Sequence, residues 1–550
     1  MWSFKGFCPA FRPGSGAGGK LCPSLVGARH GYLHPGASAR QLRIAPSGLI
    51  EVAMQLAKRL QTIFAINPQS WALEFEGHRW SWDELSGVAQ TIAAALRSAG
   101  LKEHDVVGWV ARNVPSSVAS LTGLVLSGHC ACVLNPHMAP QVLADEILTQ
   151  RFPLVIGDPQ FWAIPGVVEA ARASGSAGIV ASWSGLTTSI EPYPGLEFVG
   201  PEVHRDPMPG FVIERVSSGT TGPPKRTPQR EDAVLASLSL GQRKEAGVDE
   251  GPPRLRRSPA LVIRPLAHSG SFAVLLALYS GRPISLHEKF DIERTIDAIG
   301  RYRPKVLSLV PAMIRMIWDA RVPQELLSSL IAIRTGTAPL DSDLQQAFED
   351  KYGVPILCDY GATEFGGVAG WSLADHKRYS REKRGSAGRP IAGAQIRVMD
   401  PVTGKEILDG GVGLLEVQVD KKTTGWVGTN DLASIDEDGF LFIHGRADDA
   451  IVRGGFKVLP EEVANVLRRY PGVEDAAVVG VPDARLGHVP VAVIELRDGE
   501  RAPDEGAVKA FAREHLTPYQ VPVAFKFVDK LPRTVSMKII RSELLALAMN

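Results

Sequence analysis

The sequence is poor in cysteine, nearly free of net charge and without a long apolar run. Its five cysteines form no pair of Cys-x-x-Cys motifs; they are Cys8, Cys22, Cys130, Cys132 and Cys358. A disulfide framework or a zinc site is therefore not expected, and a reducing compartment fits. Lysine and arginine total 60 and aspartate and glutamate 59, a net charge of +1. No overall field would attract nucleic acid or an anionic membrane, so neither is an expected partner.

A transmembrane helix is also not expected, because it needs about 20 mainly apolar residues. The two best candidates are residues 116–134, interrupted by His129, and residues 261–279, interrupted by Arg264 and His268. We interpret both stretches as buried pieces of helix and strand. The 45% hydrophobic and 22% charged content is ordinary for a globular protein, and 550 residues suit several domains.

Acidic residues are absent from the first 50 positions, where Gly, Pro and Ser are frequent. The basic residues there are Lys5, Arg12, Lys20, Arg29, Arg40 and Arg43. This composition is typical of an organelle transit peptide. A disordered extension and a start codon assigned too far upstream explain it equally well, and we predict no structure for residues 1–50.

Regular structure is predicted from near residue 50. Ser81 and Glu84 have the spacing of a capping box, and the helix that they open is predicted to end at Gly100. A strand is expected at Val106–Val110. Further on, apolar strand-like runs alternate with amphipathic stretches, which predicts α/β layers with largely parallel sheets.

The pattern changes to shorter strands from about Gly393, and the last hundred residues read as a small α+β unit. The polar run Arg446–Asp449 separates two apolar strands. We therefore predict an N-terminal domain over residues 51–445 and a C-terminal domain over residues 446–550.

One segment has the composition of a phosphate-binding loop. It follows a strand-like run and combines two glycines, four hydroxyls and a lysine; its polar members are Ser217, Ser218, Gly219, Thr220, Thr221, Gly222 and Lys225. Glycines let backbone N–H groups approach a polyanion, and the hydroxyls and lysine favour phosphate oxygens. It is not a Walker A loop, because Gly and Lys are not adjacent. We call Ser217–Lys225 the phosphate loop.

Together with this loop, six later segments resemble motifs of the adenylate-forming superfamily, which includes the acyl-CoA synthetases. They appear in the family's order as Pro265–His268, Thr335–Leu340, Tyr360–Glu364, Thr429–Leu432, Gly445–Asp449 with Gly454–Val458, and Leu531–Lys538. The resemblance implies a large layered α/β domain and a small mobile α+β domain. It also implies a two-step reaction, in which a carboxylic acid and ATP give an acyl-adenylate and pyrophosphate, and coenzyme A then displaces AMP.

The resemblance assigns a role to each matching residue. Catalytic positions are Lys538, Glu364 and His268, with His268 at the wall between the acyl pocket and the thiol channel. The phosphate loop, Gly336, Thr337, Ala338, Tyr360, Gly361, Ala362, Thr363, Asp431 and Arg446 would bind ATP and AMP. Glu364 and Thr221 would hold Mg²⁺. Asp448 would be the hinge, and the thioester step would use Gly454, Gly455 and Lys457.

Four positions depart from the common pattern. Arg226 follows the loop lysine where a small residue is usual, Thr337 replaces a small residue, and Asn430 and Met537 each replace a glycine. The stretch between Glu416 and Asp431 is also shorter than in most relatives.

Two other functions stay open at this point. One is an adenylation enzyme that loads the thiol of a carrier protein; the other is a nucleotide-binding regulatory protein without turnover. The sequence does not identify the acid, and it leaves a homodimer open. The cytoplasm is the expected location, or an organelle matrix if residues 1–50 are a transit peptide.

Overall fold

A computed structural model describes residues 55–185, 187–216, 226–246, 252–420, 422–453, 456–534 and 537–550, with the backbone alone at 244–246 and 457. The extension predicted at residues 1–50 lies outside these ranges. Among the residues that the structure describes, no helix combines the length and apolar character needed to cross a membrane.

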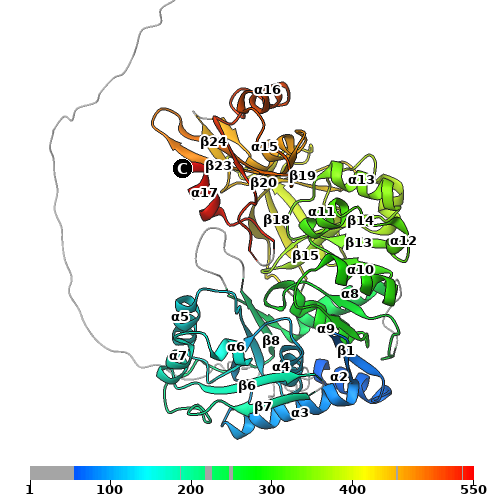
Figure 1. Cartoon of the computed structure of the whole chain (residues 1–550), viewed down its shortest axis with the longest axis vertical. Coiled ribbons are helices and arrows are strands. Elements are labelled where there is room, and N and C mark those ends of the chain that lie inside the picture. Colours follow the sequence, from blue (N-terminus) through cyan, green and yellow to red (C-terminus); the bar gives the residue numbers. More distant parts are fainter. Residues whose placement is uncertain are drawn as a thin grey trace, which may run out of the picture. The chain divides into compact units, whose positions relative to one another are not determined.

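The first layer is a seven-stranded sheet (Figure 1). Its order is β7 (Thr187–Pro192), β6 (Ala177–Ser184), β5 (Leu154–Gly157), β3 (Val106–Val110), β4 (Cys130–Leu134), β8 (Phe211–Val216) and β9 (Arg226–Arg230). The five central strands are parallel and the two edge pairs antiparallel. The accompanying helices are α3 (Trp82–Ser98), α4 (Pro115–Leu126), α5 (Pro140–Gln150), α6 (Pro159–Trp162) and α7 (Val167–Ala173).

The capping box and the strand predicted in this layer are confirmed. Ser81 Oγ accepts from the backbone N–H of Glu84, whose carboxylate accepts from the Ser81 N–H, so the predicted capping box opens α3. The predicted strand coincides with β3, and the candidate transmembrane stretch at 116–134 is buried α4 and β4.

A four-stranded sheet follows, ordered β10 (Ala260–Val262), β11 (Ile284–Leu286), β1 (Trp71–Phe75) and β2 (His78–Ser81). Its helices are α2 (Gln55–Ile66), α8 (Glu231–Ala246) and α9 (Ser271–Tyr279). The buried side chains of this sheet and of the first one form one continuous apolar cluster. The turn η1 (Leu266–Gly270) connects β10 to α9.

The next sheet has five strands, β12 (Val306–Ser308), β13 (Ala332–Thr335), β14 (Ile356–Ala362), β15 (Gly366–Gly370) and β16 (Arg389–Pro390). The first three are parallel and have their own apolar core. The helices here are α10 (Ile292–Tyr302), α11 (Pro311–Asp319), α12 (Gln324–Leu327), α13 (Ser342–Tyr352) and α14 (Leu373–Tyr379).

Two smaller sheets complete the chain. One is an antiparallel meander of β17 (Ala394–Met399), β18 (Gly413–Val419), β19 (Val427–Ile435) and β20 (Leu441–Arg446). The other contains β22 (Phe456–Val458), β21 (Ile451–Arg453), β24 (Gly487–Leu496), β23 (Val473–Asp483) and β25 (Ala524–Val528), with helices α15 (Pro460–Leu467), α16 (Glu505–His515) and α17 (Arg541–Met549). The expected fold class, a large layered α/β part followed by a smaller α+β part, is therefore confirmed.

Candidate active site

One large cavity gathers most of the residues to which the sequence assigned a role. Its lining includes His268, Gly336, Thr337, Ala338, Tyr360, Gly361, Ala362, Thr363, Glu364, Asp431, Arg446 and Lys538. The phosphate loop, with Thr221, and the pair Gly454 and Gly455 lie outside the described residues. Lys457 belongs to β22, but its side chain is also outside them.

Three strands bring an aromatic ring, a carboxylate and a guanidinium together. Tyr360 in β14 donates its hydroxyl hydrogen to Asp431 Oδ2 at 2.5 Å. Asp431 in β19 is paired in register with Arg446 in β20, and Arg446 Nη1 lies 3.7 Å from Asp431 Oδ1. Burial, followed by the charge of Asp431, raises the pKa of Tyr360, so the phenol stays protonated. The face of the Tyr360 ring, the Asp431 carboxylate and the Arg446 guanidinium together suit the binding of a purine nucleoside.

Arg446 also holds the predicted hinge residue. Its Nε and Nη2 contact the two carboxylate oxygens of Asp448 at 2.9 and 3.0 Å. Asn430, one of the residues that replace a glycine, donates from Nδ2 to Asp448 Oδ2 at 3.3 Å. The side chain of Asp448 is thus tied to β19 and β20.

The turn after β13 comes close to the backbone of β14. A Cβ on Gly336 would lie 2.6 Å from the carbonyl oxygen of Asp359, so only glycine fits there. Thr337, one of the departures from the family pattern, adopts φ 72°, which is costly for a β-branched residue. Thr335 Oγ1 is buried and has no hydrogen-bond partner among the described residues, which leaves it able to meet a ligand atom.

Lys538 is presented by a tight turn. The backbone N–H of Thr534 donates to the Lys538 carbonyl at 2.7 Å, and Thr534 Oγ1 accepts from the Lys538 N–H at 3.2 Å. Met537 adopts φ 65° in this turn, the left-handed conformation that glycine takes at less cost. The turn therefore persists with methionine, and the Met537 side chain packs against the apolar cluster around β12 and β13.

Lys538 interacts electrostatically with Glu364 and with His268. Burial lowers the pKa of Lys538, while Glu364 raises it and Arg446 lowers it. The pKa of His268 falls to about 4, first because of burial and then because of Lys538 and His137. His268 sits in η1 with unusual backbone angles (φ −119°, ψ −119°) and is neutral at ordinary pH. As a neutral imidazole near the Lys538 cation, His268 can accept a hydrogen bond or position a bound group, but it carries no charge.

Glu364 follows β14 in the turn to β15. Among the described residues, no group of three or more His, Cys, Asp and Glu side chains could hold a metal ion. A lone carboxylate still fits Mg²⁺, because this ion often binds one or two carboxylates, substrate phosphates and water. Glu364, which interacts electrostatically with Lys538, is a carboxylate of this kind.

Several charged cavity residues were not predicted. Arg334 at the end of β13 forms an ion pair with Asp359 in β14, at 2.9 Å for Nε to Oδ2. Arg215 in β8 and Lys422 after β18 also line the cavity. Arg215 offered one signal in the sequence, since it is a charge in an apolar strand just before the phosphate loop.

The departure at Arg226 has a structural explanation. Its guanidinium forms ion pairs with Glu146 and with Glu214, the latter at 3.3 Å, and Arg205 contacts the same Glu214 oxygen at 3.0 Å. Glu214 also accepts from the thiol of Cys132 at 2.8 Å. This mostly buried cluster anchors the strand β9 that begins where the phosphate loop ends.

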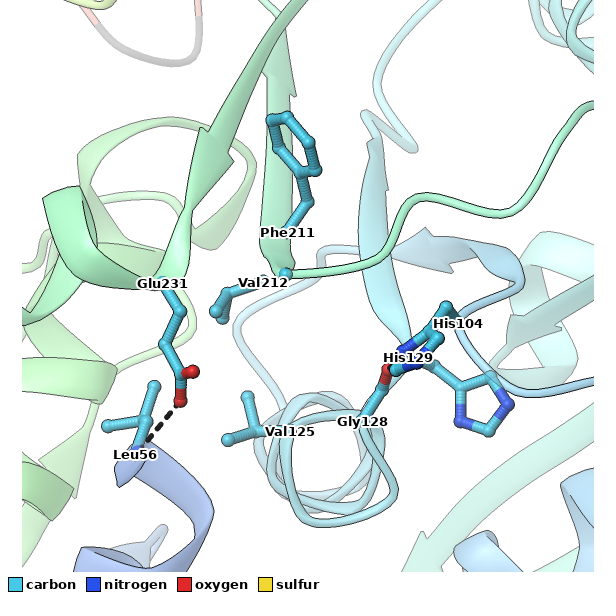
Figure 2. Close-up of a pocket in the computed structure, with 9 residues that line it drawn as sticks. Leu56, His104, Val125, Gly128, His129, Phe211, Val212 and Glu231 are labelled. Atoms are coloured by element: carbon cyan, nitrogen blue, oxygen red, sulfur yellow. Dashed lines mark hydrogen bonds between the residues drawn. The ribbon is translucent and has the colours of Figure 1, made fainter. Parts of the chain in front are cut away.

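A second, much smaller cavity shares no lining residue with the candidate site. Its volume of about 20 Å³ is room for roughly one water molecule. Figure 2 shows Glu231 reaching Leu56, and its carboxylate accepts a hydrogen bond from the Leu56 backbone N–H at 2.8 Å. His104 and His129 lie on the other side of Val125. The cavity is too small for a substrate.

Comparison with known proteins agrees with this geometry. The model of the AMP-binding enzyme family matches residues 60–421, and that of the AMP-binding enzyme C-terminal domain matches residues 462–538. The chain is 30% identical over 502 residues to a 2-succinylbenzoate–CoA ligase of Geobacillus kaustophilus (strain HTA426), covering 87% of this chain and 95% of that one. It is 29% identical over 498 residues to 4-coumarate–CoA ligase 3 of Oryza sativa subsp. japonica, covering 86% and 87%.

A solved structure shares the fold. ATP-bound MatB from Rhodopseudomonas palustris superposes with a TM-score of 0.75 at 26% identity, over 89% of this chain and 98% of that one.

Proposed function

Because this chain belongs to the AMP-binding enzyme family, we propose that it activates an aromatic carboxylic acid with ATP and transfers the acyl group to coenzyme A. The general class of the enzyme, an AMP-forming acid–thiol ligase, follows from the family and from the relatives. The observation that carries the proposal is the approach of Lys538 to Glu364 in a cavity that also contains Tyr360, Asp431 and Arg446.

In the first step a carboxylate oxygen forms a bond to the α-phosphorus of ATP, and the bond to pyrophosphate breaks. Two anions must approach each other, so a cation between them stabilises the transition state. Lys538 takes this role, while Tyr360, Asp431 and Arg446 bind the nucleoside. Mg²⁺ at Glu364 would neutralise phosphate charge.

In the second step the coenzyme A sulfur attacks the acyl carbonyl carbon, AMP leaves with the former carboxylate oxygen, and the thiol proton passes to solvent. His268 adjoins the acyl group as a neutral side chain. The hinge role of Asp448, the thioester role of Gly454, Gly455 and Lys457, and the domain boundary at residue 446 are part of this proposal.

The choice of an aromatic acid rests on the wall formed by α9. Phe272, Ala273 and Leu276 are half-buried there and line the cavity. The lining also includes the small residues Gly361 and Ala362. An apolar wall in a cavity that also has residues of little bulk favours a flat ring. Relatives named for 2-succinylbenzoate, 4-coumarate, ferulate and indoleacetate support this class.

A panel of acids tests the proposal. AMP release is measured with benzoate-type, cinnamate-type, short and long aliphatic acids, each with coenzyme A, with a phosphopantetheine-bearing carrier protein, and with no thiol. We expect ring acids with coenzyme A to give the highest rate. Phe272→Ala should raise KM for the ring acid, whereas Phe198→Ala, a 73% exposed phenylalanine, should not. Preference for aliphatic acids or for the carrier protein would contradict the corresponding half of the proposal.

A further inference from the structure

Two cations to which the family resemblance gave no role line the same cavity as Glu364. Arg215 is the residue before the last of β8, two residues before the phosphate loop. Lys422 lies in the turn after β18, in the stretch between Glu416 and Asp431. Both side chains are half-buried and line the candidate site.

The position of Lys422 is set by its own turn and by a glycine. The backbone N–H groups of Lys422 and Thr423 donate to the Val419 carbonyl at 3.1 and 3.0 Å, and Thr423 Oγ1 accepts from the Val419 N–H at 3.1 Å. The ammonium group occupies the place that a Cβ on Gly366 would take. Gly366 is the first residue of β15, so this amine sits at the start of that strand, at the end of the turn that contains Glu364.

Arg215 connects the two. It interacts electrostatically with Glu364 and with Lys422, so Arg215 is a near neighbour of each of them. With its amide oriented so that Oε1 faces the guanidinium, the neutral side chain of Gln229 accepts from Arg215 Nη2 at 2.6 Å and from Nε at 3.3 Å. Among the described residues, no carboxylate forms an ion pair with either Arg215 or Lys422.

The resulting charge is unbalanced. Arg215 and Lys538 each interact electrostatically with Glu364, and Lys422 lies close to Arg215. Like charges held close in a half-buried site are unfavourable unless an anion joins them. A magnesium ion at Glu364 would add to the excess. The site is therefore suited to a ligand with several negative charges rather than to a single carboxylate.

We propose that Arg215 and Lys422 form a subsite for the β- and γ-phosphates of ATP and for the pyrophosphate released from them. The proposal rests on the proposed ATP-dependent activation of an acid. Both side chains lie outside the phosphate loop, and Lys422 lies between Glu416 and Asp431.

The test measures binding without turnover, so that it stays informative even if no acid is found to react. Dissociation constants for inorganic pyrophosphate and for AMP are measured by calorimetry on the full chain, for the wild type, Lys422→Met, Arg215→Met and the double variant. The matched control is Lys405→Met, an exposed lysine in the hairpin between β17 and β18 of the same sheet. Lys422→Arg keeps the charge.

We expect Lys422→Met and Arg215→Met each to weaken pyrophosphate binding about tenfold or more and AMP binding less than twofold. Lys405→Met and Lys422→Arg should change neither by more than about threefold. Unchanged pyrophosphate affinity in the double variant, with a wild-type melting temperature, would overturn the proposal. So would an equal loss of AMP and pyrophosphate binding.

Discussion

The hydroxyl of Tyr360 lies 2.5 Å from Asp431 Oδ2 and joins β14 to β19 across the candidate site. Through this contact the residue assigned to the adenine ring orients the carboxylate assigned to the ribose. Tyr360→Phe keeps the ring but removes the donor to a charged acceptor. We expect KM for ATP to rise about tenfold, since such hydrogen bonds contribute about 1.5 kcal/mol. Steady-state kinetics with varied ATP measures this, and an unchanged KM would argue against the orienting role.

Lys538 is the residue on which the first step depends most in this account. Lys538→Ala should reduce acid-dependent pyrophosphate exchange by about 100-fold or more, because one preorganised charge at the transition state is removed. Lys102→Ala, an exposed lysine away from the cavity lining, serves as control. Exchange that persists in the Lys538 variant would remove the lysine from the mechanism.

Much of the fold could be read from local patterns. The capping box of Ser81 and Glu84 and the strand Val106–Val110 depend on neighbours in the sequence, and both agree with the structure. Cys130 and Cys132 are fully buried in β4, as expected of cysteines without a disulfide framework. That the site residues lie together in one site was predicted only by the family resemblance, through the order of the motifs along the chain.

The charged environment of the site could not be read in the same way. Arg205 and Arg226 meet at Glu214, and Arg215 lies near both Glu364 and Lys422, across separations that only the folded sheets close. The departures at Thr337 and Met537 were visible in the sequence. Their left-handed backbone conformation was not visible, because the identity of a residue other than glycine does not indicate a positive φ.

The hinge role of Asp448 can be separated from its contact with Arg446. Asp448→Ala removes the bidentate contact but leaves φ free, whereas Asp448→Pro removes the contact and also fixes φ. We expect both variants to adenylate at similar rates and the proline variant to form thioester about tenfold more slowly. Single-turnover measurements of each step make the comparison. Equal thioester rates in the two variants would mean that backbone rotation at this residue is not needed.

The buried imidazole of His268 predicts a particular pH dependence. Burial favours its neutral form and lowers its pKa to about 4, so its charge does not change between pH 6 and 9. Pyrophosphate exchange should therefore show no inflection from His268 near pH 6.5, and His268→Gln should keep the wild-type profile at a different height. An inflection near 6.5 that disappears in His268→Gln would show that the imidazole titrates during turnover.

The central claim is attack of a carboxylate on the α-phosphorus of ATP, and isotope transfer tests it most directly. The full chain is incubated with ATP, Mg²⁺, coenzyme A and an acid labelled with ¹⁸O in both carboxylate oxygens, and the products are analysed by mass spectrometry. The account predicts one ¹⁸O in AMP, one in the acyl-CoA and none in pyrophosphate. Label in inorganic phosphate with formation of ADP, or acyl-CoA formed with unlabelled AMP, would contradict it.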